Sequence, residues 1–192
     1  MKKKTILISI ICIIVGSLIF AFAYDAILSF VEKCEHPREY AESVQKYAVE
    51  FAIPEDIIYA VIKTESGFDK DAVSRANCVG LMQLEPKTFR WISDDMLGEK
   101  LPDSHIHNTD TNIKYGTWYL SYLCGRFYDP SLDNWETVYA AYNAGPGNVA
   151  SWLENPEYSD DGKTLKKIPF AETSNYVKRV AKAREIYIKL YY

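Results

Sequence analysis

The stretch AVIKTESGF (residues 60–68) places one carboxylate, Glu65, at the end of an otherwise apolar helical pattern and follows it at once with small residues. A carboxyl group at such a position is partly removed from water, and burial raises the pKa of a carboxylic acid. A carboxylic acid with a raised pKa can protonate the leaving oxygen of a glycosidic bond near neutral pH. Glu65 is therefore the candidate general acid of this chain.

The residues before this stretch predict the helix that carries it. Pro54, Glu55 and Asp56 form a helix start signal, with a proline and two acids in the first turn. The apolar residues that follow are spaced for burial and place Glu65 in the last turn. The same patterns predict helices over residues 38–51, 135–144 and 173–191, and two more that begin at residues 85 and 110. Residues 67–79 and 155–167 are expected to be irregular.

Three further blocks follow in order: GLMQLEP (residues 80–86), AAYNAG (140–145) and PFAETSNYV (169–177). With the Glu-Ser pair at 65–66, these blocks make residues 40–191 resemble the soluble lytic transglycosylase (SLT) family of peptidoglycan-cleaving enzymes. Four motifs in one order are far more specific than any of them alone. The resemblance implies a mostly α, lysozyme-like (α+β) fold in a single catalytic domain.

The resemblance also implies a chemistry that differs from that of most glycoside hydrolases, which use two carboxylates. In this family, one glutamic acid protonates the bond between N-acetylmuramic acid and N-acetylglucosamine in peptidoglycan strands. As a carboxylate it then accepts the proton of the muramic C6 hydroxyl, which attacks C1 of its own sugar and gives a 1,6-anhydro end. Intramolecular attack is efficient because the nucleophile is already positioned. Glu65 matches that acid.

Five residues match family positions that contact substrate or lie beside the acid: Ser66, Ser74, Gln83, Tyr142 and Asn143. Gln83 offers both a donor and an acceptor to an acetamido sugar, and Gly80 allows close backbone approach. The resemblance implies that Tyr142 hydrogen-bonds the catalytic carboxyl or a sugar hydroxyl. Ser66 and Ser74 have ordinary structural interpretations as well, as a helix-terminal residue and a loop hydroxyl.

Glu172 matches the second acid of the family, which is credited with holding the site together. A buried Glu172 needs partners, and Tyr176, one helical turn later, is the candidate. The chain departs from the family pattern at Glu85, where many relatives carry an apolar residue before the proline.

The N-terminus carries three lysines at positions 2–4, and residues 5–24 then lack any charge until Asp25. This pattern indicates a signal peptide or a signal anchor, and the length of the run favours an uncleaved anchor over residues 1–24 although Ala21-Phe22-Ala23 offers a cleavage site. The positive end stays in the cytoplasm, so residues 25–37 form a stalk and residues 38–192 a domain outside the cell membrane. The alternative is a secreted domain.

Composition limits the other possibilities. The chain has 192 residues with a net charge of −4, which gives one domain and no electrostatic footprint for nucleic acid. Three scattered histidines (His36, His105 and His107) argue against a metal site, and no cofactor is expected. Cys34, Cys78 and Cys124 are expected to be thiols, although one pair could form a disulfide outside the membrane.

Three alternatives remain open at this stage. A muramidase of lysozyme type would hydrolyse the same bond and would need a positioned water, with Asp69, Asp71 or Glu172 as the second carboxylate. A non-catalytic wall-binding module would keep the fold for its groove. The intact site residues argue against this module: Glu65, Gln83, Tyr142 and Glu172. A subunit of an envelope-spanning secretion or conjugation machine is compatible with enzymatic activity, and its partners are unknown.

Overall fold

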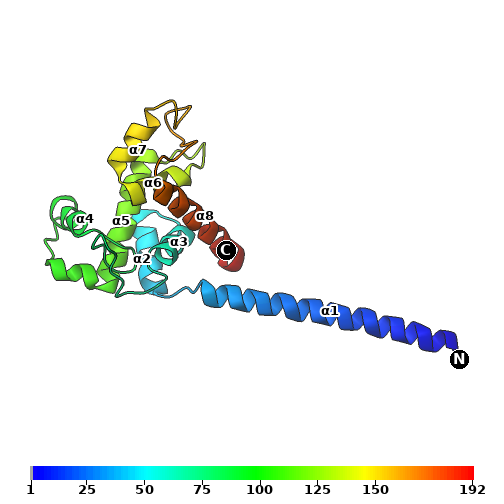
Figure 1. Ribbon diagram of the computed structural model, residues 1–192. Helices are drawn as coiled ribbons and strands as arrows, with labels where there is room; N and C mark the ends of the chain where they lie inside the picture. Colours follow the sequence, from blue (N-terminus) through cyan, green and yellow to red (C-terminus); the bar gives the residue numbers. More distant parts are fainter. Residues whose placement is uncertain (1) are drawn as a thin grey trace.

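The computed structural model describes residues 2–192, with side chains described for Lys4 and from Ile13 onward. It is almost entirely helical (Figure 1). The elements in chain order are α1 (Lys2–Glu35), α2 (Ala41–Phe51), α3 (Glu55–Glu65), α4 (Pro86–Arg90), the π-helix η1 (Trp91–Met96), the 3-10 helix η2 (Asp103–His107), α5 (Thr109–Phe127), α6 (Trp135–Ala144), α7 (Pro146–Leu153) and α8 (Ala171–Tyr191).

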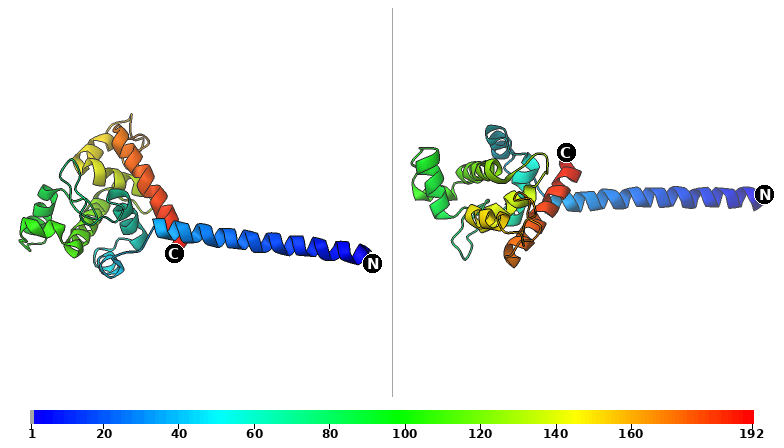
Figure 2. Two further views of the ribbon diagram at one scale, coloured as in Figure 1. Left: turned by 60° about the horizontal axis from the view of Figure 1, so that its bottom comes forward. Right: turned by 90° about the horizontal axis from the view of Figure 1, so that it is seen from above.

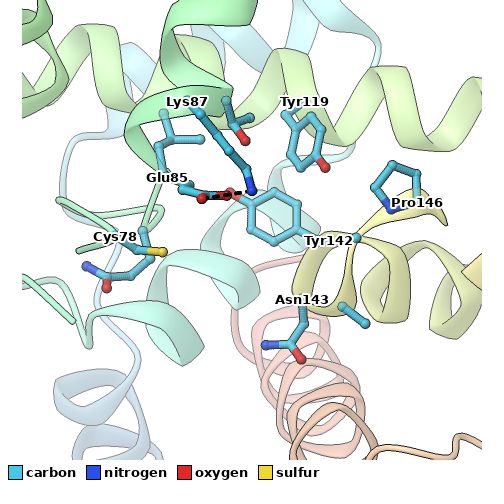
Figure 3. Close-up of a pocket in the computed structure, with 12 residues that line it drawn as sticks. Cys78, Glu85, Lys87, Tyr119, Tyr142, Asn143 and Pro146 are labelled. Atoms are coloured by element: carbon cyan, nitrogen blue, oxygen red, sulfur yellow. Dashed lines mark ion pairs between the residues drawn. The ribbon is translucent and has the colours of Figure 1, made fainter. Parts of the chain in front are cut away.

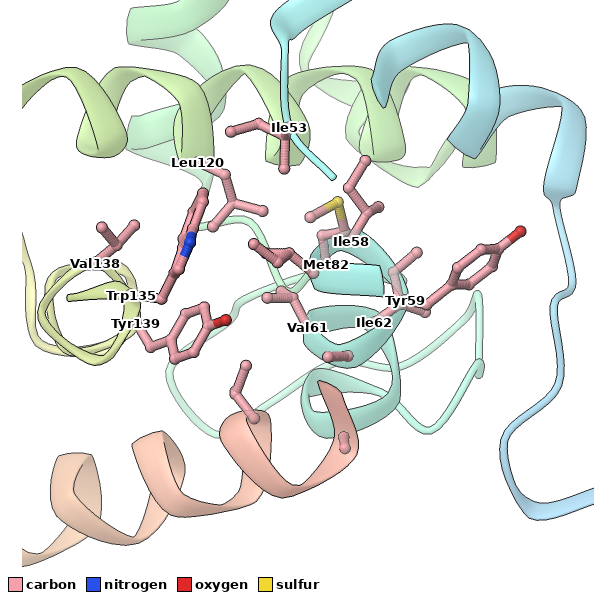
Figure 4. Close-up of a cluster of buried hydrophobic side chains, with 14 of the residues drawn as sticks. Ile53, Ile58, Tyr59, Val61, Ile62, Met82, Leu120, Trp135, Val138 and Tyr139 are labelled. Atoms are coloured by element: carbon pink, nitrogen blue, oxygen red, sulfur yellow. The ribbon is translucent and has the colours of Figure 1, made fainter. Parts of the chain in front are cut away.

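Helix α3 lies at the centre of the domain and is buried on all sides. Six consecutive residues, from Ile57 to Ile62, are 0% exposed. A helix segment that is apolar all round belongs in the core of a domain. Helix α8 packs along α3 and α6, and α5 packs against α2 and α6. Figure 4 shows Val61 and Ile62 of α3 in the same cluster as Leu120 of α5 and Tyr139 of α6.

The segment between α3 and α4 is irregular, as the sequence predicts. It consists of turns and two isolated antiparallel bridges, Val73 with Val79 and Val79 with Leu84. The described residues contain no longer strand, so the β part of the expected lysozyme-like fold is reduced to these bridges. The segment nevertheless brings residues 80–83 beside the end of α3, where Glu65 lies.

Helix α6 ends where the sequence predicts. Gly145 follows it with φ of 86°, a backbone conformation that favours glycine. Pro146 then opens α7, a helix that the sequence analysis does not predict. Proline at the first helical position is common, since its missing N–H has no intrahelical partner there. The polar segment 155–167 is irregular, as expected.

Helix α1 projects away from the domain, and the C-terminal end of α8 lies beside its end (Figure 2). Residues 13–35 are long and apolar enough to cross a membrane, with a mean hydropathy of 2.0. The expected stalk is helical as far as Glu35 and continuous with the apolar run. The side chains of Lys2, Lys3 and residues 5–12, which belong to the expected anchor, lie outside the described part of the chain. Cys34, Cys78 and Cys124 are free cysteines.

Three interactions connect the end of α1 to α8. Lys189 forms a 2.8 Å ion pair with Glu32. The hydroxyl of Tyr187 donates a 2.9 Å hydrogen bond to the carbonyl oxygen of Pro37. Tyr191 donates one of 2.8 Å to the carbonyl oxygen of His36. The C-terminal helix therefore ties the apolar helix to the domain.

Candidate active site

Glu65 is the last residue of α3, as predicted. Part of the residue remains accessible, but the surrounding protein removes most water from its carboxyl group. This burial raises the pKa of Glu65 from 4.5 to about 7, against the opposing effects of the Tyr176 hydroxyl and the Arg179 guanidinium. A carboxyl group with this pKa is about half protonated at neutral pH and can act as a general acid there.

Two tyrosines flank this carboxyl group, and their hydroxyls do different things. Tyr142, at the end of α6, donates a 2.8 Å hydrogen bond to the carbonyl oxygen of Met82 rather than to Glu65. Tyr176, on α8, is 2% exposed, and its hydroxyl has no hydrogen-bond partner among the described residues. Burial, and then the charge of Glu65, raise the pKa of both phenols far above the ordinary value. Both hydroxyls therefore remain proton donors at any working pH.

The turn over residues 80–83 is held by a buried side chain, Asn112 of α5. Its amide group donates to the carbonyl oxygens of Val79 (2.9 Å) and Ile106 (3.0 Å), and its carbonyl oxygen accepts from the backbone N–H of Met82 (2.9 Å). Gly80 has φ of 78°, and a Cβ there would lie 2.6 Å from Asn112 Nδ2. Only glycine fits this close approach, so the predicted need for Gly80 has a specific cause.

The predicted polar residues of the turn region bind backbone. Ser66 donates a 2.9 Å hydrogen bond to the carbonyl oxygen of Leu81, which joins the end of α3 to the turn. Gln83 donates to the carbonyl oxygens of Ala72 (3.1 Å) and Gly80 (2.9 Å), so its Oε1 is the atom left for an external donor. Ser74 is exposed and accepts from the N–H of Cys78 at 3.0 Å.

A cavity of about 310 Å³ adjoins this arrangement (Figure 3). Glu65 does not line the cavity, but its charge helps to raise the pKa values of Cys78 and Tyr142, two residues of the cavity wall. The residues labelled in the figure are Cys78, Glu85, Lys87, Tyr119, Tyr142, Asn143 and Pro146. Glu85 forms a 2.9 Å ion pair with Lys87 on the wall, where the family pattern is apolar.

Asn143 and Glu172 lie at a second opening, together with Thr173. Asn143 accepts a 2.8 Å hydrogen bond from the hydroxyl of Thr173, which joins the end of α6 to the start of α8. The expected burial of Glu172 beside Tyr176 is wrong, because Glu172 is exposed in the first turn of α8. Tyr176 is buried and faces Glu65, because the second turn of α8 lies inside the domain whereas Glu172, in the first turn, lies at the surface.

Two residues of this region were missed by the sequence analysis. Asn112 is not among the predicted site residues, although it lies one turn before Gly116 on the buried side of α5 and is 1% exposed. A polar residue on an apolar face is the signal that could have identified it. Arg179 had no signal, because its effect on Glu65 depends on how α8 packs along α3. The described residues contain no group of three side chains suited to a metal ion.

Comparison with known proteins decides the family. The model of the transglycosylase SLT domain matches residues 42–165, more than half of the chain. This chain belongs to the transglycosylase SLT domain family. The matched range contains Glu65, Gln83 and Tyr142, whereas the helix with Glu172 and Tyr176 follows it.

Curated relatives in the SLT family agree with this assignment. The chain is 31% identical to membrane-bound lytic murein transglycosylase C of Haemophilus ducreyi in an alignment of 176 positions that covers 80% of this chain and 46% of that protein. It is 33% identical to the soluble lytic murein transglycosylase of Escherichia coli K12 over 147 residues, covering 75% and 22% of the two chains. The chain thus spans about half the length, or less, of the relatives it matches.

Solved SLT structures share the fold. An inactive glutamate-to-glutamine mutant of lytic transglycosylase Slt from Pseudomonas aeruginosa superposes with a TM-score of 0.70 at 29% identity, covering 82% of this chain and 25% of that chain. The 70 kDa soluble lytic transglycosylase in complex with bulgecin A gives a TM-score of 0.71 at 28% identity over the same shares. The expected lysozyme-like SLT fold is confirmed.

Proposed function

We propose that this chain is a membrane-anchored peptidoglycan lytic transglycosylase. It cleaves the β-1,4 bond between N-acetylmuramic acid and N-acetylglucosamine and leaves a 1,6-anhydromuramic end. The observation that carries this proposal is Glu65, a carboxyl group whose pKa burial raises to about 7 at the end of a buried helix. Glu65 protonates the leaving oxygen and then, as a carboxylate, accepts the proton of the muramic C6 hydroxyl.

The surroundings of Glu65 support a mechanism with one carboxylate. Asp69, Asp71 and Glu172, the possible second acids of a hydrolase, are all exposed. No other carboxylate contributes to the pKa of Glu65 in the described structure. The unpartnered hydroxyl of Tyr176 is placed to stabilise the carboxylate that forms after proton donation.

Relatives support the same reaction class. The relatives from Haemophilus ducreyi and Escherichia coli are named lytic murein transglycosylases, and the Pseudomonas aeruginosa enzyme is inactive as a glutamate-to-glutamine mutant. The complex of the 70 kDa enzyme with bulgecin A makes this compound a useful probe. We expect bulgecin A to bind this chain and to compete with glycan strands.

The membrane assignment rests on α1. Its charge-free run of residues 5–24 is about 30 Å long as a helix, which matches the hydrocarbon core of a bilayer. Lys2, Lys3 and Lys4 precede the run and favour a cytoplasmic N-terminus. The catalytic domain then lies outside the membrane, where peptidoglycan is found.

Product analysis of the full-length protein in detergent tests the proposal. Digestion of purified peptidoglycan should release muropeptides that end in 1,6-anhydro-N-acetylmuramic acid. Each should be lighter than the corresponding hydrolysis product by the mass of one water (~18 Da). Glu65→Gln should abolish release, since glutamine can neither give nor accept the proton. Muropeptides with hydrated reducing ends would assign a muramidase, and undiminished cleavage by Glu65→Gln would refute the site.

A further inference from the structure

The part of α1 nearest the domain turns its polar side inward and its apolar side outward. Ser29 and Glu32 lie towards α8 and are half-buried, and Glu32 forms its ion pair with Lys189 there. On the other side of the helix, Ile27 is 62% exposed and Phe30 is 69% exposed. A surface helix normally shows the reverse arrangement, with its apolar side towards the protein. Within the described chain, this apolar side has no covering surface.

A seam of five exposed residues runs along this apolar side and continues into the charge-free run: Phe20, Tyr24, Ile27, Val31 and Cys34. Successive members are four, three, four and three positions apart. This alternation gives a period of about 3.5 residues and keeps the side chains on one side of a helix. Such a period is typical of a helix that pairs with another helix along its length.

Lipid covers only the inner half of the seam. The charge-free run of residues 5–24 already matches the hydrocarbon core. At about 1.5 Å per residue, Val31 lies ~10 Å and Cys34 ~15 Å beyond the end of this run along the helix axis. Headgroups extend only ~5–8 Å beyond the core, and a tilt of about 20° shortens these heights by ~1 Å or less. Val31 and Cys34 therefore stand in water, where covering an apolar surface is favourable.

We propose that this seam binds the same seam of a second copy of the chain, so that two α1 helices pair in parallel. The inference rests on the membrane anchoring proposed for α1 but not on the proposed activity. An anchor holds every copy at the same depth and in the same direction. Two copies therefore meet in register, and each seam residue lies opposite its own counterpart. A different protein would need the same spacing at the same depth.

The charges of α1 and the position of the domain allow this pairing. Asp25, Glu32 and Lys33 each follow a seam residue by one or two positions, which places them on the outer sides of a parallel pair. The domain contacts α1 through Lys189 on the side of Glu32, away from the seam. Two α1 helices can therefore approach each other without any change in either domain.

The size of the contact indicates that the membrane segment takes part. Burying one apolar side chain removes ~60–120 Å² from water, as follows from ~1.5–3 kcal/mol at ~25 cal/mol per Å². Tyr24, Ile27, Phe30 and Val31 of two copies then bury ~500–1,000 Å², less than the ~1,200–2,000 Å² of a stable interface. The same four-and-three spacing continues inward through Ile13, Ser17 and Phe20, whose packing supplies the remainder.

Disulfide cross-linking in membranes tests the register. The full-length protein carries Cys12→Ser, Cys78→Ser and Cys124→Ser, which leaves Cys34 as its thiol. Copper-phenanthroline catalyses the oxidation by dioxygen: two thiols lose two electrons and two protons, one S–S bond forms, and half a dioxygen becomes water. A disulfide needs Cα atoms ~4.4–6.8 Å apart. We expect a covalent dimer on a non-reducing gel.

Moving the thiol around the helix gives matched controls. With Cys34→Ser added, Ile27→Cys and Val31→Cys should cross-link about as fast as Cys34 does. Ser29→Cys and Lys33→Cys, on the outer sides of the pair, should cross-link at least 10-fold more slowly. Equal rates at seam and outer positions would indicate random collision and would overturn the inference. Cross-links to other membrane proteins without a dimer of this chain would overturn it as well.

Light scattering of the full-length protein in detergent measures pairing without a cross-link. Ile27→Asn with Val31→Asn should raise the dissociation constant of the dimer at least 10-fold, because both changes remove apolar surface from the contact. Val49→Asn with Leu132→Asn, which changes two exposed apolar residues of the domain, is the control and should leave the constant unchanged. An unmodified protein that is monomeric at every concentration would overturn the inference.

Washing the membranes with carbonate tests the anchor separately. Protein that stays in the washed membranes and cross-links at the seam supports both anchoring and pairing. Protein that washes off but still cross-links at the seam would contradict the anchor and leave the pairing in place. Neither result depends on cleavage of peptidoglycan, so failure of the proposed activity is measured independently by its products.

Discussion

The hydroxyl of Tyr142 donates a 2.8 Å hydrogen bond to the carbonyl oxygen of Met82 and so joins the end of α6 to the turn over residues 80–83. Tyr142 thereby supports the cavity wall, whereas the hydroxyl of Tyr176 faces Glu65 without a hydrogen-bond partner in the described structure. Two tyrosines beside one carboxyl group therefore have separate tasks, one in packing and one in charge stabilisation.

These tasks predict opposite effects of removing the two hydroxyls. Tyr142→Phe leaves the Met82 carbonyl oxygen without its partner and should lower the free energy of unfolding by ~1–2 kcal/mol. Tyr176→Phe removes a hydroxyl that faces the Glu65 carboxyl, which is mostly protonated and uncharged at pH 5, so stability at that pH should change by less than ~0.5 kcal/mol. It should instead shift the pH profile of kcat/KM upward, because the hydroxyl opposes the rise in the pKa of Glu65. Urea unfolding and pH–rate profiles measure the two effects; equal losses of stability would contradict them.

Asn112 should be the most sensitive polar residue of the site support. Asn112→Ala removes three hydrogen bonds and leaves the N–H of Met82 and the carbonyl oxygen of Ile106 without a partner, whereas the carbonyl oxygen of Val79 keeps its bond from the N–H of Leu84. We expect a loss of ~3 kcal/mol in the free energy of unfolding, measured by denaturant titration. Asn148→Ala, which removes one exposed hydrogen bond to Ala144, is the control and should cost less than ~0.5 kcal/mol.

Glu172 is exposed at the opening beside Asn143, so its substitution is expected to affect substrate binding rather than stability. Glu172→Gln should leave the free energy of unfolding within ~0.5 kcal/mol, because the side chain is exposed. If Glu172 supports the site, the loss should appear in KM for glycan strands rather than in stability. Steady-state kinetics beside thermal unfolding separate the two. A lower melting temperature of Glu172→Gln than of the unmodified protein would show instead that Glu172 stabilises the fold.

The sequence predicted the parts of this fold that depend on local patterns. The position of Glu65 follows from the start signal at 54–56 and the apolar run after it, and the end of α6 follows from Gly145. Contacts between distant segments could not be predicted this way. The hydrogen bond from Tyr142 to Met82 joins residues 60 positions apart, and the effect of Arg179 on Glu65 needs the packing of α8 on α3.

The wrong expectation for Glu172 has the same origin. Glu172 and Tyr176 are one helical turn apart, and spacing alone predicts that they share a face of α8. The helix begins at Ala171, so Glu172 lies in its exposed first turn while Tyr176 lies beneath Glu65. Periodicity gives the face of a helix, but the depth of each turn depends on the neighbouring helices.

The pKa of Glu65 predicts the pH dependence of activity. The general acid must be protonated in the free enzyme, so kcat/KM should be level below about pH 6 and fall tenfold per pH unit well above about pH 7. Because one group serves as acid and then as base, no second carboxylate should impose an acidic limb near pH 4 to 5. A bell-shaped profile with such a limb would indicate a second essential carboxylate and favour a hydrolase.

The same pKa predicts that Glu65→Gln stabilises the protein above neutral pH. The folded chain holds the Glu65 proton up to about pH 7, whereas an unfolded chain releases it near 4.5. Between these values the folded state binds more protons, so its stability falls as pH rises, by up to ~3 kcal/mol in all. Glu65→Gln removes this loss.

The variant should therefore exceed the unmodified protein in free energy of unfolding by up to ~3 kcal/mol at pH 8, with the gain shrinking to nothing below about pH 4.5. Denaturant titrations at pH 4, 6 and 8 measure it. Glu42→Gln, which removes an exposed acid on α2, is the matched control and should not show this pH-dependent gain. If the difference in free energy of unfolding between Glu65→Gln and the unmodified protein is the same at all three pH values, the carboxyl group of Glu65 is solvated. The assignment of Glu65 as a general acid near neutral pH would then lose its physical basis.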